Sequence, residues 1–175
     1  MSDIEGCLAC DLTNGRRPLP GGIVFEADGW LVEHCIGPLG VGTLIVKPRA
    51  HVLRFRDLTP AEYRAFGRVL WLVTTALGDL LGPDQTYVCQ WAHAGWIPGH
   101  IHYVIQPAWN TQGEAHERPG PFLQVDLFNA NEPLPSAEVE AFSRRAREAL
   151  MQLAASASPS PAAPVRRGGG EGVRG

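Results

Sequence analysis

Two histidines that alternate with apolar residues are the part of this 175-residue sequence best suited to chemistry. They lie in the segment 99–107, Gly-His-Ile-His-Tyr-Val-Ile-Gln-Pro, whose alternation predicts a β-strand. Side chains two residues apart in a strand point to the same face, so we expect His100 and His102 to lie side by side. An imidazole can bind a metal ion, move a proton or attack phosphorus, and two neighbouring imidazoles can divide these tasks.

A second reactive group is the Cys-x-x-Cys pair of Cys7 and Cys10. In a reducing compartment such a pair indicates either metal binding or redox chemistry. A thioredoxin-type redox pair opens a helix, whereas this pair precedes Asn14, Gly15 and two prolines, which predict a loop or short turn. The context therefore favours metal binding.

A third histidine, His51, follows the segment Lys-Pro-Arg-Ala at the end of a predicted strand. Two thiolates and two imidazoles complete a tetrahedral zinc site of the closed, structural type. We predict that Cys7, Cys10, His51 and His100 bind a structural zinc ion. The alternative is a hydrolytic zinc ion with a bound water, which requires an open coordination position.

The elements that position these residues follow from hydrophobic periodicity and turn signals. Strands are predicted at 23–26, 30–36, 43–46, 86–91 and 99–107, with Asp28 and Gly29 forming a hairpin turn. A long helix is predicted to begin after Thr59 and to reach Leu81, and a C-terminal helix spans 136–153. The fold class is α+β: an antiparallel five-stranded sheet packed with one long helix, plus the C-terminal helix.

The chain divides into three predicted regions. Residues 1–110 form one domain with the Cys-x-x-Cys zinc loop, and residues 111–153 form an irregular loop and the C-terminal helix packed on it. The Gly-rich and Pro-rich part of this loop, 109–135, is a candidate substrate cover. Residues 154–175 are rich in Ala, Ser, Pro and Gly, which predicts a disordered tail.

The net charge of −3 and the pI of about 6.0 argue against nucleic acid or a membrane surface as a partner and favour a small molecule. The sequence has no 18-residue apolar run, and its acidic start lacks the basic and apolar stretches of a secretory signal. We therefore expect a cytoplasmic protein.

In combination, these segments resemble the histidine triad (HIT) family. The resemblance covers residues 7–107 and is carried by the Cys-x-x-Cys pair with the following Gly-Arg-Arg-Pro, the hairpin, the segment Lys-Pro-Arg-Ala-His-Val, the long helix, Gly95 and the histidine strand. It implies a HIT-like fold, a homodimer and a nucleotide or nucleoside phosphate as ligand. In the zinc-containing branch, the metal ligands fall on the same Cys7, Cys10, His51 and His100.

The resemblance also implies a function. His102 would attack the α-phosphate of a dinucleoside polyphosphate or related nucleotide and form a nucleotidyl-histidine intermediate, which makes the protein a nucleotide phosphohydrolase or nucleotidyltransferase. The candidate substrate-binding residues are Gln90, His93, Gly95 and Trp96.

Departures from the family pattern support an alternative function. Val104 stands where the third histidine of the triad would be, Thr43 replaces a second family histidine, and Cys35 occupies the acidic ribose-binding position. The alternative is a zinc-braced nucleotide-binding or regulatory protein with reduced catalysis.

Four other residues carry weaker expectations. His34 and His116 have no partner at an informative spacing, so we expect both to be solvated. Trp30 and Trp71 are expected in the core.

Overall fold

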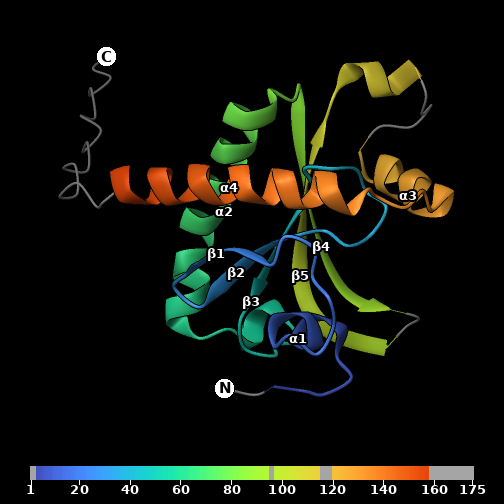
Figure 1. Ribbon diagram of the computed structural model, residues 1–175. Helices are drawn as coiled ribbons and strands as arrows, with labels where there is room; N and C mark the ends of the chain where they lie inside the picture. Colours follow the sequence, from blue (N-terminus) through green and yellow to red (C-terminus); the bar gives the residue numbers. More distant parts are fainter. Residues whose placement is uncertain (1–2, 95–96, 115–119, 158–175) are drawn as a thin grey trace, which may run out of the picture.

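A five-stranded antiparallel sheet with the order β1-β2-β3-β5-β4 carries the other elements of the computed structural model (Figure 1). The structure describes residues 3–94, 97–114 and 120–157. The strands are β1 (Ile23–Ala27), β2 (Trp30–His34), β3 (Leu44–Pro48), β4 (Gln85–Ala94) and β5 (Ile97–Ala108). The helices are α1 (Leu8–Thr13), α2 (Pro60–Leu81), α3 (Pro121–Ala130) and α4 (Ser136–Ser156), with short 3-10 turns at Phe55–Asp57 and Asn110–Glu114. The predicted α+β class is confirmed.

The turn between β1 and β2 is the predicted hairpin. Asp28 and Gly29 both have positive φ angles, 52° and 84°, as the two central residues of a type I′ turn require. Ala27 therefore pairs directly with Trp30.

Helix α2 begins and ends where its capping residues predict. The Thr59 hydroxyl accepts from the backbone N–H of Glu62, and the Glu62 carboxylate accepts from the backbone N–H of Thr59 at 2.8 Å. Gly82 ends the helix in the left-handed conformation. The buried face of α2 packs on the sheet through Val69, Leu72, Val73, Ala76 and Leu77.

Trp71 was expected in the core but is 52% exposed, so that expectation was wrong. The helix turns its neighbour Leu72 to the sheet, and Trp71 lies about 100° away from Leu72 around the helix axis. Trp30, by contrast, is fully buried and donates its Nε1–H to the Glu62 carbonyl at 2.9 Å.

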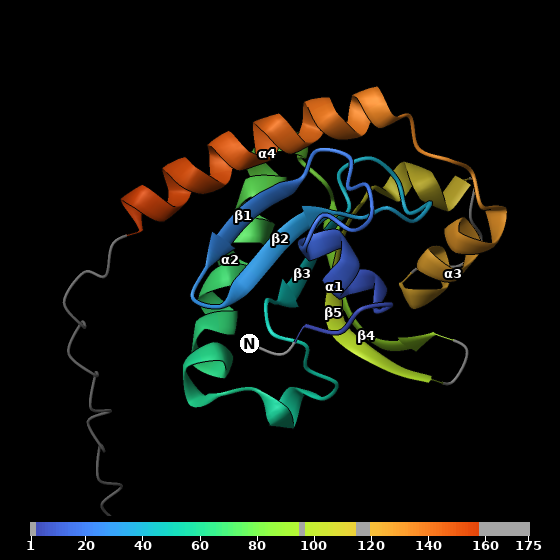
Figure 2. The same cartoon turned by 60° about the horizontal axis from the view of Figure 1, so that its bottom comes forward.

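Helix α4 extends the core beyond the sheet. It runs across α2 and β1 (Figure 2) and buries Val139, Phe142, Ala146 and Leu150. The predicted C-terminal helix is therefore present, and it continues three residues beyond the expected end, from Leu153 to Ser156.

The two faces of the sheet are covered differently. Ile101, Tyr103 and Ile105 of β5 belong to the large core under α2 and α4, and the alternate residue Val104 belongs to a smaller apolar cluster on the other face. Leu127 of α3 packs against that smaller cluster. Helix α1 contacts the same face, through the Lys47 and His100 contacts described below.

Two segments expected to be irregular contain helices. Residues 111–135 were predicted as loop because Gly, Pro and Asn are frequent, but these residues flank α3: Pro121 begins it and Asn131 ends it in the left-handed conformation. Likewise, the Cys-x-x-Cys pair was expected on a loop, whereas Cys7 is the N-cap of α1 and Cys10 lies within it. Asn14 and Gly15 end this helix and do not prevent it.

His34 was expected to be solvated, and this was wrong, because the side chain is buried at the end of β2. Its Nδ1–H donates to the Cys35 carbonyl at 2.7 Å, and its Nε2 accepts from the Gly42 N–H at 2.9 Å. Burial lowers the pKa of His34, and the bond from the Gly42 N–H requires an unprotonated Nε2, so the ring is in its neutral form. His116 lies outside the described residues.

Among the residues that the structure describes, we find no helix with the length and apolar character needed to cross a bilayer.

The packing of α4 against the chain before β1 gives a prediction about Gly21. A Cβ at Gly21 would lie 2.4 Å from the Ser143 Cβ, whereas a Cβ at Gly22 meets nothing within 4 Å, and both glycines have positive φ. Gly22→Ala should cost about 1 kcal/mol of backbone strain, and Gly21→Ala about 2–4 kcal/mol because overpacking is added. Urea denaturation of each variant measures the change in the free energy of unfolding.

Ser143→Gly provides the control, because it removes the side chain that the new methyl group would strike. In that background the two alanine variants should cost similar amounts. Equal destabilisation of Gly21→Ala and Gly22→Ala in the natural background would contradict the packing of α4 at this point.

Candidate functional site

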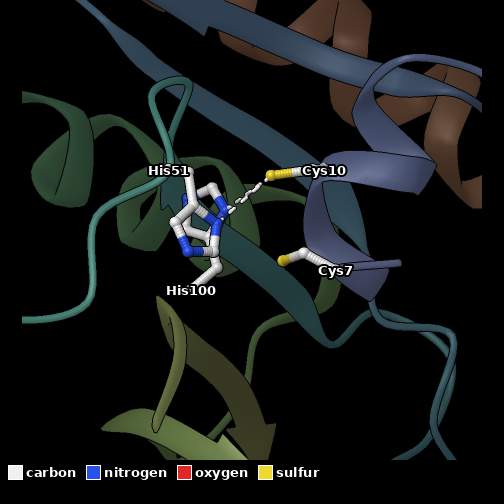
Figure 3. Close-up of side chains that lie close together, drawn as sticks. All are labelled: Cys7, Cys10, His51 and His100. Carbon is white, nitrogen blue, oxygen red and sulfur yellow. Dashed lines mark hydrogen bonds between the residues drawn. The ribbon is translucent and has the colours of Figure 1, made fainter. Parts of the chain in front are cut away.

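Four side chains from three parts of the chain converge beside the sheet (Figure 3). Cys7 is the N-cap residue of α1 and Cys10 lies within that helix, while His51 follows β3 and His100 lies on β5. Their ligand atoms all lie within 4.8 Å of one another. The Cys10 Sγ is 3.4 Å from the His51 Nδ1 and 3.6 Å from the His100 Nδ1. A tetrahedral zinc ion separates a sulfur and a nitrogen ligand by about 3.5 Å, so this donor set fits the ion.

His100 is held in the form that a metal ion needs. Its Nε2–H donates to the Pro48 carbonyl at 2.8 Å, which leaves the lone pair on Nδ1, the nitrogen beside Cys10. Burial lowers the pKa of His100 to about 4, so the ring is neutral at pH 7. Burial also raises the pKa of the Cys10 thiol, and a metal cation is the partner that favours the thiolate there.

The segment carrying His51 is attached to the same strand. The Ile101 N–H donates to the Val52 carbonyl at 2.9 Å, and the His51 and His100 rings meet edge to face with centroids 5.2 Å apart. The cluster therefore joins three parts of the chain: α1, strand β5 and the segment that follows β3. The predicted metal ligands are brought together, and their chemistry supports the predicted zinc ion.

A buried ion pair connects this cluster to the sheet. Lys47 of β3 is fully buried, and its Nζ lies 2.8 Å from a carboxylate oxygen of Glu33 on β2. The same Nζ donates to the carbonyl of Ala9, between the two cysteines, at 2.8 Å. Burial raises the pKa of Glu33, and the Lys47 charge opposes that effect. The buried ion pair of Lys47 was not predicted from the sequence, although a lysine directly after the apolar run Leu44–Val46 indicates it.

His102 lies on the same strand face as His100. Its Nδ1–H donates to the His100 carbonyl at 3.1 Å, so the lone pair is on Nε2. Burial lowers the pKa of His102, which keeps the ring neutral near pH 7. A neutral, oriented imidazole of this kind can act as a nucleophile or as a base.

An apolar cluster occupies the sheet beyond His102. Val104 packs with Cys35, Leu39 and Ile45, and Trp91 and Leu127 lie against them. Thr43 and Gln106, which border this cluster, both donate to the Leu39 carbonyl, at 2.8 Å and 3.2 Å. Two of the positions that depart from the family pattern, Val104 and Cys35, are therefore filled with packed apolar side chains.

The predicted substrate-binding residues do not all lie at His102. Gln90 pairs with Tyr103 and accepts its hydroxyl hydrogen at 3.0 Å, on the α2 side of the sheet, so the structure does not bring Gln90 to the His102 face. The backbone of His93 pairs with Pro98 in the β4–β5 hairpin. Gly95 and Trp96 lie outside the described residues.

One polar side chain of this face was missed entirely. Gln124 of α3 is buried, and its Oε1 accepts from the Nε1–H of Trp91 at 3.3 Å. Trp91 is the direct cross-strand partner of His102. The only sequence signal for a buried polar residue here was a glutamine inside the mostly apolar stretch 121–128. Because that stretch was expected to be irregular, no buried position could be predicted for it.

The buried ion pair predicts a large effect of Lys47→Met. Removing the ammonium leaves a buried carboxylate without its counter-charge, which should lower the free energy of unfolding by about 3–5 kcal/mol at pH 8. The loss should shrink toward pH 5, because the raised pKa of Glu33 lets that carboxyl group take up a proton. Denaturant titrations at both pH values measure it.

Arg49→Met is the matched control, because the ion pair of Arg49 and Glu26 lies at the surface, with 35% and 46% of the side chains exposed. Its cost should stay below about 1 kcal/mol. The double variant Glu33→Leu with Lys47→Met should recover much of the stability lost in Lys47→Met. Similar costs for the buried and the exposed pair would show that Lys47 has no such structural role.

This chain is similar to known proteins in structure. No family model matches the chain, and a search of curated proteins finds no match. Solved structures do match. A hypothetical histidine triad nucleotide-binding protein from Sulfolobus tokodaii has a TM-score of 0.64 at 18% identity, over 84% of this chain and 93% of its own.

Two further structures agree. A Hit-like protein involved in cell-cycle regulation from Bartonella henselae has a TM-score of 0.64 at 16% identity, over 85% of this chain and 99% of its own. A zinc-bound histidine triad family protein from Mycobacterium smegmatis has a TM-score of 0.61 at 21% identity, over 86% of this chain and 97% of its own. The chain therefore has the HIT-like fold, as predicted.

Proposed function

We propose that this protein is a zinc-containing member of the histidine triad family that acts on a nucleotide, as a phosphohydrolase or a nucleotidyltransferase, with His102 as the nucleophile. The observation that carries the proposal is the hydrogen bond from the His102 Nδ1–H to the His100 carbonyl. It fixes one tautomer and leaves the Nε2 lone pair for attack.

The reaction would proceed in two displacements. The Nε2 of His102 attacks the α-phosphorus, a phosphorus–nitrogen bond forms, and the bond from phosphorus to the leaving phosphate oxygen breaks. Water or another acceptor hydroxyl then attacks the same phosphorus and gives its proton to solvent, while the phosphorus–nitrogen bond breaks and the imidazole leaves in its neutral form with its Nδ1–H. Burial lowers the pKa of His102, which favours the unprotonated ring that the first step needs.

The metal cluster supports this site without taking part in the reaction. We propose that Cys7, Cys10, His51 and His100 hold a zinc ion, which when bound supplies a structural crosslink between α1 and the sheet. All four coordination positions would be taken by protein atoms, which favours the structural role over a zinc-bound water. His100, engaged through both nitrogens, then serves to position the strand that carries His102.

The zinc proposal predicts that metal content depends on the cluster alone. The purified protein should contain about one zinc per chain by mass spectrometry of metals, and Cys10→Ser should lose most of it, with a lower Tm. Chelation should lower the Tm of the natural protein in the same way.

Cys89→Ser is the control, because Cys89 lies on β4 away from the cluster and should leave the zinc content unchanged. A Cys10→Ser protein that still holds one zinc per chain would contradict the proposed ligand set.

The apolar packing around Val104 favours a second candidate function. With a valine, a cysteine and a leucine at or beside the positions that carry polar contacts in the family pattern, the site is suited to holding a ligand with slow turnover or none. In this case the protein would be a nucleotide-binding or regulatory member of the family.

Covalent trapping separates the two candidates. Incubation with a dinucleoside tetraphosphate or a nucleoside triphosphate labelled at the α-phosphate, followed by alkaline denaturation, should leave label on His102, because the phosphorus–nitrogen bond is labile to acid. His102→Ala should take no label. Peptide mass spectrometry identifies the labelled residue.

Tyr103→Phe is the matched control, since its side chain faces α2 on the opposite side of the strand, and it should still be labelled. Nucleotide binding without label would favour the second candidate, and label on another residue would contradict the role of His102. The homodimer and the cytoplasmic location stay predictions from sequence.

A further inference from the structure

Gln124 is a buried polar residue on the helix that covers the His102 face of the sheet. Gln124 lies on α3 and is 1% exposed, although it carries a polar side chain. Helix α3 packs on the His102 face of the sheet, because its Leu127 contacts the cluster of Val104 and Ile45. Trp91, which binds Gln124, lies directly opposite His102 in the β4–β5 pair, where facing side chains are about 5 Å apart at Cβ.

The contact with Trp91 fixes the orientation of the amide. An indole Nε1–H can only donate, so the group that faces Trp91 must be the Oε1 of Gln124, at 3.3 Å. The NH2 group therefore points away from the indole ring. In the ranges 3–94, 97–114 and 120–157, the Nε2 of Gln124 finds no hydrogen-bond partner.

The neighbouring thiol does not satisfy this donor. Burial raises the pKa of Cys89, and a contact with the Gln124 amide partly opposes that effect, which places the amide beside the Cys89 sulfur. A thiol sulfur is only a weak acceptor. Buried polar groups in folded proteins almost always have a partner. An NH2 group whose nearby acceptor is only a thiol sulfur, beside the cross-strand partner of His102, is therefore suited to an acceptor from outside the chain.

We propose that the Gln124 NH2 group donates to a non-bridging oxygen of the phosphoryl group held at His102, and that it is a substrate-contacting residue of this site. The inference rests on the proposed function, because it requires a phosphorylated ligand at His102. Phosphoryl oxygens are acceptors that carry negative charge, and a fixed amide donor beside an otherwise apolar wall favours them. The wall consists of Val104, Ile45 and Leu127.

Two substitutions separate the donor from the rest of the side chain. Gln124→Glu keeps an oxygen for the Trp91 indole but replaces the NH2 group with a second, negatively charged oxygen. Gln124→Met keeps the volume and removes both polar atoms. Binding is measured by calorimetry with the four nucleoside 5′-monophosphates and, separately, with the corresponding nucleosides, which lack the phosphoryl group.

The natural protein should bind at least one monophosphate. For that ligand, Gln124→Met should raise Kd about 10-fold or more, as the loss of one hydrogen bond to a charged group predicts, and Gln124→Glu should raise it further. In either variant, Kd for the nucleoside should change by less than about 3-fold, which is well below the change expected for the monophosphate. The rate of label transfer to His102 should fall in parallel with the monophosphate affinity.

Gln106→Met is the matched control, because Gln106 is equally buried but its NH2 group already donates to the Leu39 carbonyl. This variant should lower the Tm without changing Kd for the monophosphate. A purely structural role of Gln124 would produce the same pattern, a change in Tm at constant Kd, and would overturn the inference. So would equal losses for the monophosphate and its nucleoside.

The two proposals fail in different ways. If the natural protein binds no monophosphate and takes no label, both the proposed function and the role of Gln124 are wrong. If the natural protein binds or is labelled and both Gln124 variants behave like it, only the role of Gln124 is wrong.

Discussion

The buried ammonium of Lys47 is the interaction on which the rest of the site depends. It pairs with Glu33 across two strands and donates to the Ala9 carbonyl, so one charge joins β2, β3 and the helix that carries both cysteines. A charge inside a protein is tolerated only when such partners surround it. Its field also lowers the pKa of His100 and His102, adding to the larger effect of burial, and so helps keep both rings neutral.

Strand β5 then gives two identical residues different chemistry through backbone hydrogen bonds. His100 donates from Nε2 to Pro48, which leaves Nδ1 free toward Cys10. His102 donates from Nδ1 to the His100 carbonyl, which leaves Nε2 free. The opposite nitrogen is available in each ring, one suited to a metal ion and the other to an electrophile. A bound metal ion would therefore stiffen the residue whose carbonyl orients His102.

The region beyond His102 is where this chain departs from the family pattern. Val104, Cys35 and Leu39 pack into a small apolar cluster, and α3 covers it with Leu127 while inserting the amide of Gln124 beside Trp91. The sheet lacks polar groups at these positions, and α3, which lies beyond the sequence resemblance over residues 7–107, adds the amide of Gln124. In the proposed site, α3 supplies a ligand contact beside the histidine strand.

The sequence by itself indicated the strands, the capped helix α2, the hairpin turn and the Cys-x-x-Cys pair, because alternation, capping residues and the spacing of the two cysteines are local signals. It also offered His51 and His100 as candidate ligands, but their meeting with the cysteines is a tertiary contact. It did not determine that Cys10 lies in a helix, that His34 is buried or that Trp71 is exposed, since each depends on which neighbours pack there. Gln90 and Gln124 show the difference most clearly: strand register turns Gln90 to the α2 side, and the packing of α3 brings Gln124 to His102's neighbour Trp91. Side-chain chemistry can be read along a chain, but the partner of each polar group is decided only when distant elements meet.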